Sequence, residues 1–410
     1  MQKYVLSQNK NSNVEDFQMR EQLITTFKNR FTTYGYKQVR TSTFEQYDMY
    51  GSITGTVNKD EMIKVIDTSG KVLVLRPDVT IPLARMNTAT TNQRLFYVLD
   101  VFRQSIEQID QKESTQAGVE LFGDNSLEAD AEVIVLAIHT LRDLGFTNFK
   151  IELGHAGFFK ELVQQADLNQ SQLETLKTYI HSKNLVEIEP FLNELRLADD
   201  LRNAIQLIPM MYGNPGDVIT QAKQIILNAS MQQVLQNIID VYDVLVDYGV
   251  ADSIVLNLGL INNMDYYSGI IFQGFLDNVG KPVLMGGRYD HLGKQFGKAT
   301  PAIGFAFEVD YLVHALNQQG KAIVESGIDL IINYDKAKQK VALESAYQLR
   351  NEGLQVLTYL FDEKDTNRPP STYIVNYTND EQQLIIENKT ITFASVNELV
   401  SQCLAVKEAK

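Results

Sequence analysis

Two long stretches of strand-forming residues, Arg94–Arg103 and Thr115–Phe122, follow each other across one polar segment. Two long strands joined by a polar loop are typical of an antiparallel hairpin. The chain is therefore expected to form an α+β fold around an antiparallel sheet, and not a repeated βαβ array. Further candidate strands of the same domain are Lys37–Thr41, Lys71–Arg76, Phe149–Leu153, Ser253–Leu258, Gly269–Phe275 and Ile303–Phe307.

Helical patterns surround these strands. Apolar residues recur at helical spacing from Asn13, a candidate N-cap, to Gly35, and a second amphipathic helix is predicted between Ser126 and Gly145. From about 155 to 250 the sequence pattern is typical of helices and includes a candidate capping box at Ser171–Glu174. This stretch is expected to be a helical insertion in the sheet domain.

The chain is long enough for two domains. Residues 1–320, which end in a predicted helix at Val309–Leu316, are expected to form the sheet domain. After Gly320, strands and helices alternate, with strands at Ile328–Asn333, Leu354–Leu360 and Tyr373–Tyr377. Residues 321–410 are therefore expected to form a small α/β domain.

Composition excludes several classes of protein. The 51 acidic and 37 basic residues give a net charge of −14, which disfavours wrapping a nucleic acid. A single cysteine, Cys403, excludes an internal disulfide, and the five histidines do not stand at metal-ligand spacing. No apolar run is long enough to cross a membrane, and the first residues do not form a secretory signal. We expect a cytoplasmic protein without metal, cofactor, membrane or nucleic-acid binding.

Six short motifs carry a more specific signal. In chain order they are Leu75–Thr80 (LRPDVT), Val101–Arg103 (VFR), Gln116–Glu120 (QAGVE), Met264–Gly269 (MDYYSG), Gly286–Asp290 (GGRYD) and Pro301–Ala306 (PAIGFA). Each is weak alone, but all six together, in this order, resemble the signature segments of the histidyl-tRNA synthetases. The resemblance covers about residues 35–316. It implies a class II aminoacyl-tRNA synthetase-like domain, and a C-terminal unit similar in position and element order to an anticodon-binding domain.

A free amino acid with an imidazole side chain presents a cation, an anion and two ring nitrogens. Its pocket needs a carboxylate, hydrogen-bond donors and a polar partner for the ring. The resemblance implies that Asp78, Thr80 and Gln116 hold the α-amino group. It likewise implies that Glu120 and Tyr267 meet the imidazole nitrogens.

Three neighbouring positions have alternative interpretations. Arg103 either binds the ligand carboxylate or pairs with a strand neighbour. If Tyr266 and Tyr267 lie on a strand, they point to opposite faces. Tyr267 is then the better ligand candidate, and Tyr266 is a core residue. The resemblance nevertheless includes Tyr266 in the site. Gly286, Gly287 and Arg288 are expected to form a turn beside the pocket.

The motifs also depart from the synthetase pattern. Asn262 and Tyr311 stand where that family has arginines, and Gln104 and Ser105 replace its aromatic-Glu pair. Amino-acid activation depends on cations that stabilise the reacting phosphate, and removing one such group costs about 10²- to 10³-fold in rate. We therefore expect histidine binding to be retained and ATP-dependent activation to be lost, with no catalytic residue in this chain.

A synthetase-like chain with these properties resembles the regulatory subunits of ATP phosphoribosyltransferase. That family is needed for the activity of the short-form catalytic subunit and conveys feedback inhibition by histidine. The resemblance implies this partner and a homodimer, although Ser42 takes the place of the proline usual in the dimer motif. Two alternatives are a histidine-activating enzyme with an unorthodox site and a stand-alone histidine-binding protein.

Overall fold

The computed structural model describes residues 14–51, 57–87, 92–104, 112–261, 266–320, 328–361, 368–378, 381–386 and 389–407. Asn13 and Asn262 lie outside these ranges. The chain divides into two compact units, Met1–Lys321 and Ala322–Lys410. Among the described residues, no helix is both long and apolar enough to cross a membrane.

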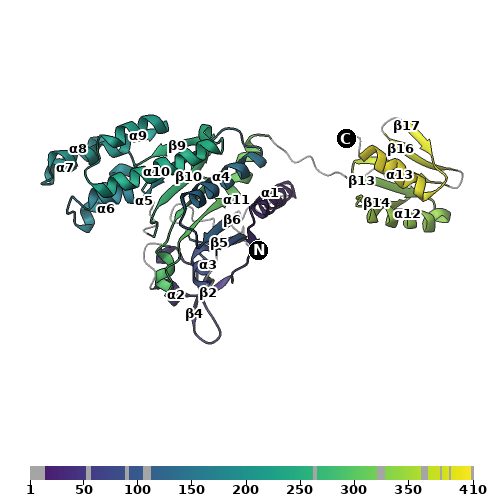
Figure 1. Cartoon of the computed structure of the whole chain (residues 1–410). Coiled ribbons are helices and arrows are strands. Elements are labelled where there is room, and N and C mark those ends of the chain that lie inside the picture. Colours follow the sequence, from purple (N-terminus) through teal and green to yellow (C-terminus); the bar gives the residue numbers. More distant parts are fainter. Residues whose placement is uncertain are drawn as a thin grey trace, which may run out of the picture. The chain divides into compact units, whose positions relative to one another are not determined.

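A nine-stranded sheet forms the centre of the first unit, in the order β1-β5-β6-β12-β11-β10-β7-β9-β8 (Figure 1). The six strands from β5 to β7 pair antiparallel, and the parallel pairs are β1 with β5 and β7 with β9. The strands are β1 Lys37–Gln38, β5 Gln93–Phe102, β6 Glu113–Phe122, β7 Phe149–His155, β8 Tyr212–Gly213, β9 Ile254–Asn257, β10 Ile270–Leu276, β11 Leu284–Arg288 and β12 Ala302–Glu308. The predicted hairpin is confirmed as β5 and β6.

Three helices pack on one face of this sheet: α1 (Val14–Thr33), α4 (Leu127–Asp143) and α11 (Val309–Gln318). Phe27 of α1 packs on Phe307 of β12, with 5.2 Å between the ring centroids. Because side chains alternate along a strand, Gly304, Ala306 and Glu308 face the opposite side. As predicted, Ser126 caps α4.

The opposite side carries a three-stranded sheet in the order β2-β4-β3 and two short helices. These elements are β2 Phe44–Gln46, β3 Lys64–Ile66, β4 Val72–Leu75, α2 Tyr47–Gly51 and α3 Thr80–Met86. The predicted strand at Lys71–Arg76 therefore exists as β4, but it belongs to this small sheet. Arg76 joins the two sheets, because its buried guanidinium donates to the carbonyls of Thr41 and Asp100.

Helices dominate the segment between β7 and β9. They are α5 Ala156–Val163, α6 Gln170–His181, α7 Leu185–Glu194, α8 Asp199–Leu207, α9 Pro215–Lys223 and α10 Ala229–Asp247. The capping prediction was wrong by two positions: Asn169 caps α6, and Gln172 completes the capping box. Asn169 also has the short acceptor side chain that an N-cap requires, so the sequence offered two starts for this helix.

The second unit contains a five-stranded sheet in the order β14-β13-β15-β16-β17. β13 pairs parallel with both β14 and β15. Its elements are β13 Ile328–Tyr334, α12 Gln339–Asn351, β14 Val356–Leu360, β15 Ser371–Tyr377, β16 Gln382–Ile386, β17 Lys389–Thr392 and α13 Val396–Lys407. The strands β16 and β17 were not predicted from the sequence.

Candidate functional site

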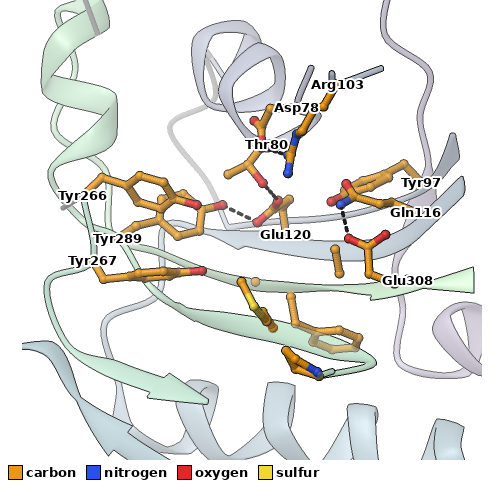
Figure 2. Close-up of a pocket in the computed structure, with 15 residues that line it drawn as sticks. Asp78, Thr80, Tyr97, Arg103, Gln116, Glu120, Tyr266, Tyr267, Tyr289 and Glu308 are labelled. Atoms are coloured by element: carbon orange, nitrogen blue, oxygen red, sulfur yellow. Dashed lines mark hydrogen bonds and ion pairs between the residues drawn. The ribbon is translucent and has the colours of Figure 1, made fainter. Parts of the chain in front are cut away.

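A pocket lies on the face of the large sheet opposite α1 (Figure 2). Its floor is set by strand register: Glu120 of β6 pairs with Gly304 of β12, and Gln116 pairs with Glu308. Between these two rows Gly118 pairs with Ala306. Directly paired residues of antiparallel strands point to the same face, so this register brings the polar side chains together. The cavity between these side chains has a volume of about 90 Å³.

Two glycines of the sheet let neighbouring tyrosine rings approach the strands closely. A Cβ on Gly118 would lie 2.5 Å from the Tyr97 ring, and one on Gly287 would lie 2.9 Å from the Tyr267 ring. Real Cβ atoms essentially never come closer than 3.0 Å to such neighbours. The glycines therefore let the tyrosine rings lie directly on the strands.

Asp78, Thr80 and Arg103 close the pocket from the other side. Asp78 precedes α3, and its Oδ1 accepts the backbone N–H of Ile81 at 2.7 Å. Arg103 donates from Nε to the Pro77 carbonyl at 2.6 Å, and its terminal nitrogen lies 3.9 Å from Asp78 Oδ2. Arg103 thus lines the pocket and also pairs with a neighbouring carboxylate, so both interpretations of this residue hold in part.

Glu120 lies at the centre of the pocket and is only 2% exposed. The Thr80 hydroxyl donates to its Oε1 at 2.6 Å, and the Tyr289 hydroxyl donates to Oε2. Burial raises the pKa of Glu120 to about 8, although both hydroxyls and their hydrogen bonds oppose the shift. The carboxyl group therefore changes its protonation state close to neutral pH.

Tyrosines form one wall of the pocket. Tyr266 and Tyr267 precede β10 and are not part of a strand, and their ring centroids lie 4.7 Å apart. Tyr266 also meets Tyr289 edge to face at 5.8 Å. The expectation that Tyr266 and Tyr267 point to opposite faces was wrong, because the strict alternation of a strand does not apply in a loop. Both residues line the pocket.

The opposite end of the pocket is formed by Gln116 and Glu308. The Gln116 amide donates to Glu308 Oε1 at 2.7 Å. Burial raises the pKa of Glu308, and the amide of Gln116 opposes that shift. Glu308 was missed from the sequence because it lies outside the motifs. Glu308 lies two residues after Ala306 and four residues after Gly304 on the same strand. Because side chains alternate along a strand, this spacing was the signal that could have placed Glu308 on the same face.

The structure brings all seven sequence-predicted residues to one pocket: Asp78, Thr80, Arg103, Gln116, Glu120, Tyr266 and Tyr267. Tyr311 lies in the first turn of α11 and does not line the pocket. Among the described lining residues are three carboxylates, Asp78, Glu120 and Glu308, and one guanidinium, that of Arg103. Such a pocket fits a ligand that carries a positive charge.

The predicted turn at Gly286, Gly287 and Arg288 was wrong, since all three belong to β11 in the middle of the sheet. Arg288 points away from the pocket-lining set and into a buried ion pair, with 2.6 Å between its terminal nitrogen and Asp130. Glycines weaken a strand, but a Cβ on Gly287 would clash with the Tyr267 ring, and one on Gly286 would clash with Phe305.

The sequence matches known proteins over most of its length. The family model for histidyl-tRNA synthetase matches residues 11–312. The ATP phosphoribosyltransferase regulatory subunit of Oceanobacillus iheyensis is 44% identical over 400 residues, 97% of this chain and 98% of the relative. The protein of the same name from Ruminiclostridium cellulolyticum is 36% identical over 340 residues, 81% of each chain.

Solved structures resemble this chain over nearly its whole length. An ATP phosphoribosyltransferase regulatory subunit/histidyl-tRNA synthetase from Bacillus halodurans C superposes with a TM-score of 0.81 at 26% identity, covering 92% of this chain and all of that one. A histidyl-tRNA synthetase from Nostoc sp. PCC 7120 gives a TM-score of 0.79 at 16% identity, covering 96% of each chain, which supports the fold alone.

The antiparallel sheet and these likenesses define a class II aminoacyl-tRNA synthetase-like protein of the histidyl-tRNA synthetase type. The fold class predicted from the sequence is therefore confirmed. Within this type, the chain belongs to the family of ATP phosphoribosyltransferase regulatory subunits.

Proposed function

We propose that this chain is a regulatory subunit of ATP phosphoribosyltransferase that binds histidine and catalyses no reaction itself. It acts on the short-form catalytic subunit, which needs it for activity, and conveys feedback by histidine. The names of its relatives support a regulatory role in histidine biosynthesis. The pocket supports the choice of ligand.

Histidine fits the distribution of polar groups. The imidazole lies toward the tyrosine wall, where Glu120 and Tyr267 meet its nitrogens. The ligand carboxylate pairs with Arg103, whose guanidinium can form two parallel hydrogen bonds. Asp78, Thr80 and Gln116 are the groups that the synthetase resemblance assigns to the α-amino group, and Tyr266 completes the aromatic wall.

The charged groups of the pocket disfavour ATP-dependent activation of an amino acid. Three carboxylates and one guanidinium line its described part. The phosphates of ATP need several cations, both to bind and to stabilise the charge that develops during phosphoryl attack. The described lining offers one cation, that of Arg103, which is too few for a polyphosphate, whereas a zwitterionic amino acid can be satisfied by one guanidinium and the carboxyl groups.

Regulation requires an assembly with two states. Histidine shifts activity only if it binds one state of the complex more tightly than the other. We propose a cytoplasmic hetero-oligomer of the catalytic subunit with a dimer of this chain. The unit after residue 320 serves packing or assembly in this proposal, as a remnant of an anticodon-binding domain.

Calorimetric titration of histidine into the isolated chain, repeated with the short-form catalytic subunit present, tests the proposal. We expect binding in both cases, and inhibition of the complex at histidine concentrations that saturate this chain. Histidine-dependent exchange of pyrophosphate into ATP above background would instead identify a histidine-activating enzyme. Histidine binding without co-purification of any short-form catalytic subunit would identify a stand-alone binding protein.

A further inference from the structure

Two carboxylates at opposite sides of the pocket are each next to a helix N-terminus, but only one of them caps its helix. Asp78 Oδ1 accepts the N–H of Ile81 in the first turn of α3. Glu308 is the N-cap residue of α11, yet its side chain makes no capping hydrogen bond. Its carboxylate is turned to Gln116 at the pocket end instead.

Asp78 is already engaged by protein groups. One oxygen caps α3, and the other lies 3.9 Å from Arg103. A ligand ammonium bound there would compete with the guanidinium that is needed for the ligand carboxylate.

Glu308 has the opposite character. Its described hydrogen-bond partners are neutral, namely the Gln116 amide and the Ser114 hydroxyl. Among the described residues no cationic side chain lies within ion-pair distance of it. Arg103 attracts this partly buried carboxylate only from beyond ion-pair distance. A carboxylate in such a place without a direct ion pair is costly, and a ligand cation would reduce that cost.

Gln116 contributes a second hydrogen-bond acceptor at this end of the pocket. Its NH₂ group must face Glu308, since a carboxylate only accepts hydrogen bonds, and its carbonyl oxygen therefore remains an acceptor. A carboxylate oxygen and an amide oxygen thus lie together. This pair matches an ammonium group, which donates three hydrogen bonds and accepts none.

We propose that Glu308, together with Gln116, binds the α-ammonium group of the amino-acid ligand, and that Asp78 positions Arg103 for the carboxylate. This inference rests on the proposed function, because it assumes histidine in the pocket. It reassigns the ammonium partner from the motif residue Asp78 to a residue outside the motifs. It also makes Glu308 the residue that distinguishes an amino acid from its deaminated analogue.

The test compares two ligands that differ only in the amine: L-histidine and 3-(imidazol-4-yl)propionate. Calorimetry on the full chain is expected to show tighter binding of histidine. Glu308→Gln, which keeps the size and the contact with Gln116, should weaken histidine by about 10- to 100-fold and leave the deaminated ligand within about threefold. Glu308→Asp retains the charge at a shorter reach and should give a preference for histidine between those of the wild type and Glu308→Gln.

Asp78→Asn is the matched comparison. It is expected to weaken both ligands by a similar factor, because both depend on Arg103. The proposal is overturned if Asp78→Asn removes the preference for histidine and Glu308→Gln does not. A wild-type chain that binds neither ligand would overturn the histidine pocket itself, whereas histidine binding that Glu308→Gln leaves unchanged would overturn only this inference. Thermal unfolding of each variant confirms that a lost signal is not lost folding.

Discussion

Glu120 and Gly304 face each other across the β6–β12 pair, and the carboxylate of Glu120 lies directly over the Gly304 backbone. A Cβ at position 304 would come far inside the 3.0 Å that real Cβ atoms keep, both from Glu120 Oε2 and from the Val119 carbonyl oxygen. The position of the central carboxylate thus depends on the absence of a side chain on the neighbouring strand.

Gly304→Ala is therefore expected to displace Glu120 and to weaken histidine binding by at least about tenfold. Overpacking of this kind also typically costs about 1–3 kcal/mol of stability. Calorimetry and chemical denaturation measure the two effects. Gly280→Ala is the control, because Gly280 is exposed and has no atom within 4 Å of an added Cβ. Equal histidine affinity in both variants would show that Glu120 is not part of the binding site.

The protonation of Glu120 predicts a specific pH dependence. Its pKa is raised by burial from 4.5 to about 8, so between these values the folded chain holds a proton that the unfolded chain has lost. The free energy of unfolding should therefore fall as the pH rises through this interval, and level off above about 8. The slope from this one group is roughly 1 kcal/mol per pH unit.

Glu120→Gln removes the titrating group. The difference in unfolding free energy between the wild type and this variant should change with pH between 5 and 8 and be flat above that range. Denaturant unfolding at several pH values measures it. Glu128→Gln, at an exposed position of α4, serves as the control. A pH-independent difference between wild type and Glu120→Gln would mean that Glu120 does not change protonation in this range.

Local patterns were sufficient to predict much of this fold. The β5–β6 hairpin, the Ser126 cap and the long helices all follow from periodicity and capping chemistry within short windows. The sequence motifs likewise named seven residues that the structure brings to one pocket. These features depend on neighbours in sequence or on a family signature.

The features that were missed depend on distant partners. Gly286, Gly287 and Arg288 suggest a turn when read locally, but β11 is stabilised by strands on both sides and by an ion pair with Asp130, 158 positions away. Glu308 meets Gln116 across 192 positions. Nothing near Glu308 in the sequence indicates that partner, and only the register of β6 and β12 reveals it.

The buried pair of Arg288 and Asp130 predicts a large loss of stability. Both side chains are less than 10% exposed, and Arg288 Nε donates to Asp130 Oδ1 at 2.8 Å. Arg288→Met should destabilise the chain by about 3–5 kcal/mol, because it leaves Asp130 buried without a counter-ion. Chemical denaturation measures the loss. Arg142→Met breaks an exposed pair with Asp252 and should cost less than about 1 kcal/mol; similar losses in both variants would contradict this account.

If Arg103 binds the ligand carboxylate, its substitution should weaken only ligands that have a carboxylate. The same reasoning applies to Glu308 and the ligand amine. Its guanidinium is fixed by the Pro77 carbonyl and faces the pocket beside Asp78. Arg103→Gln should weaken L-histidine by about 10- to 100-fold, since a charge-assisted pair is lost. Histamine, which has the imidazole and the amine but no carboxylate, should bind the wild type and Arg103→Gln about equally. Calorimetry with both ligands decides the point, because a parallel loss for histidine and histamine would assign Arg103 to the structure of the pocket and not to the carboxylate.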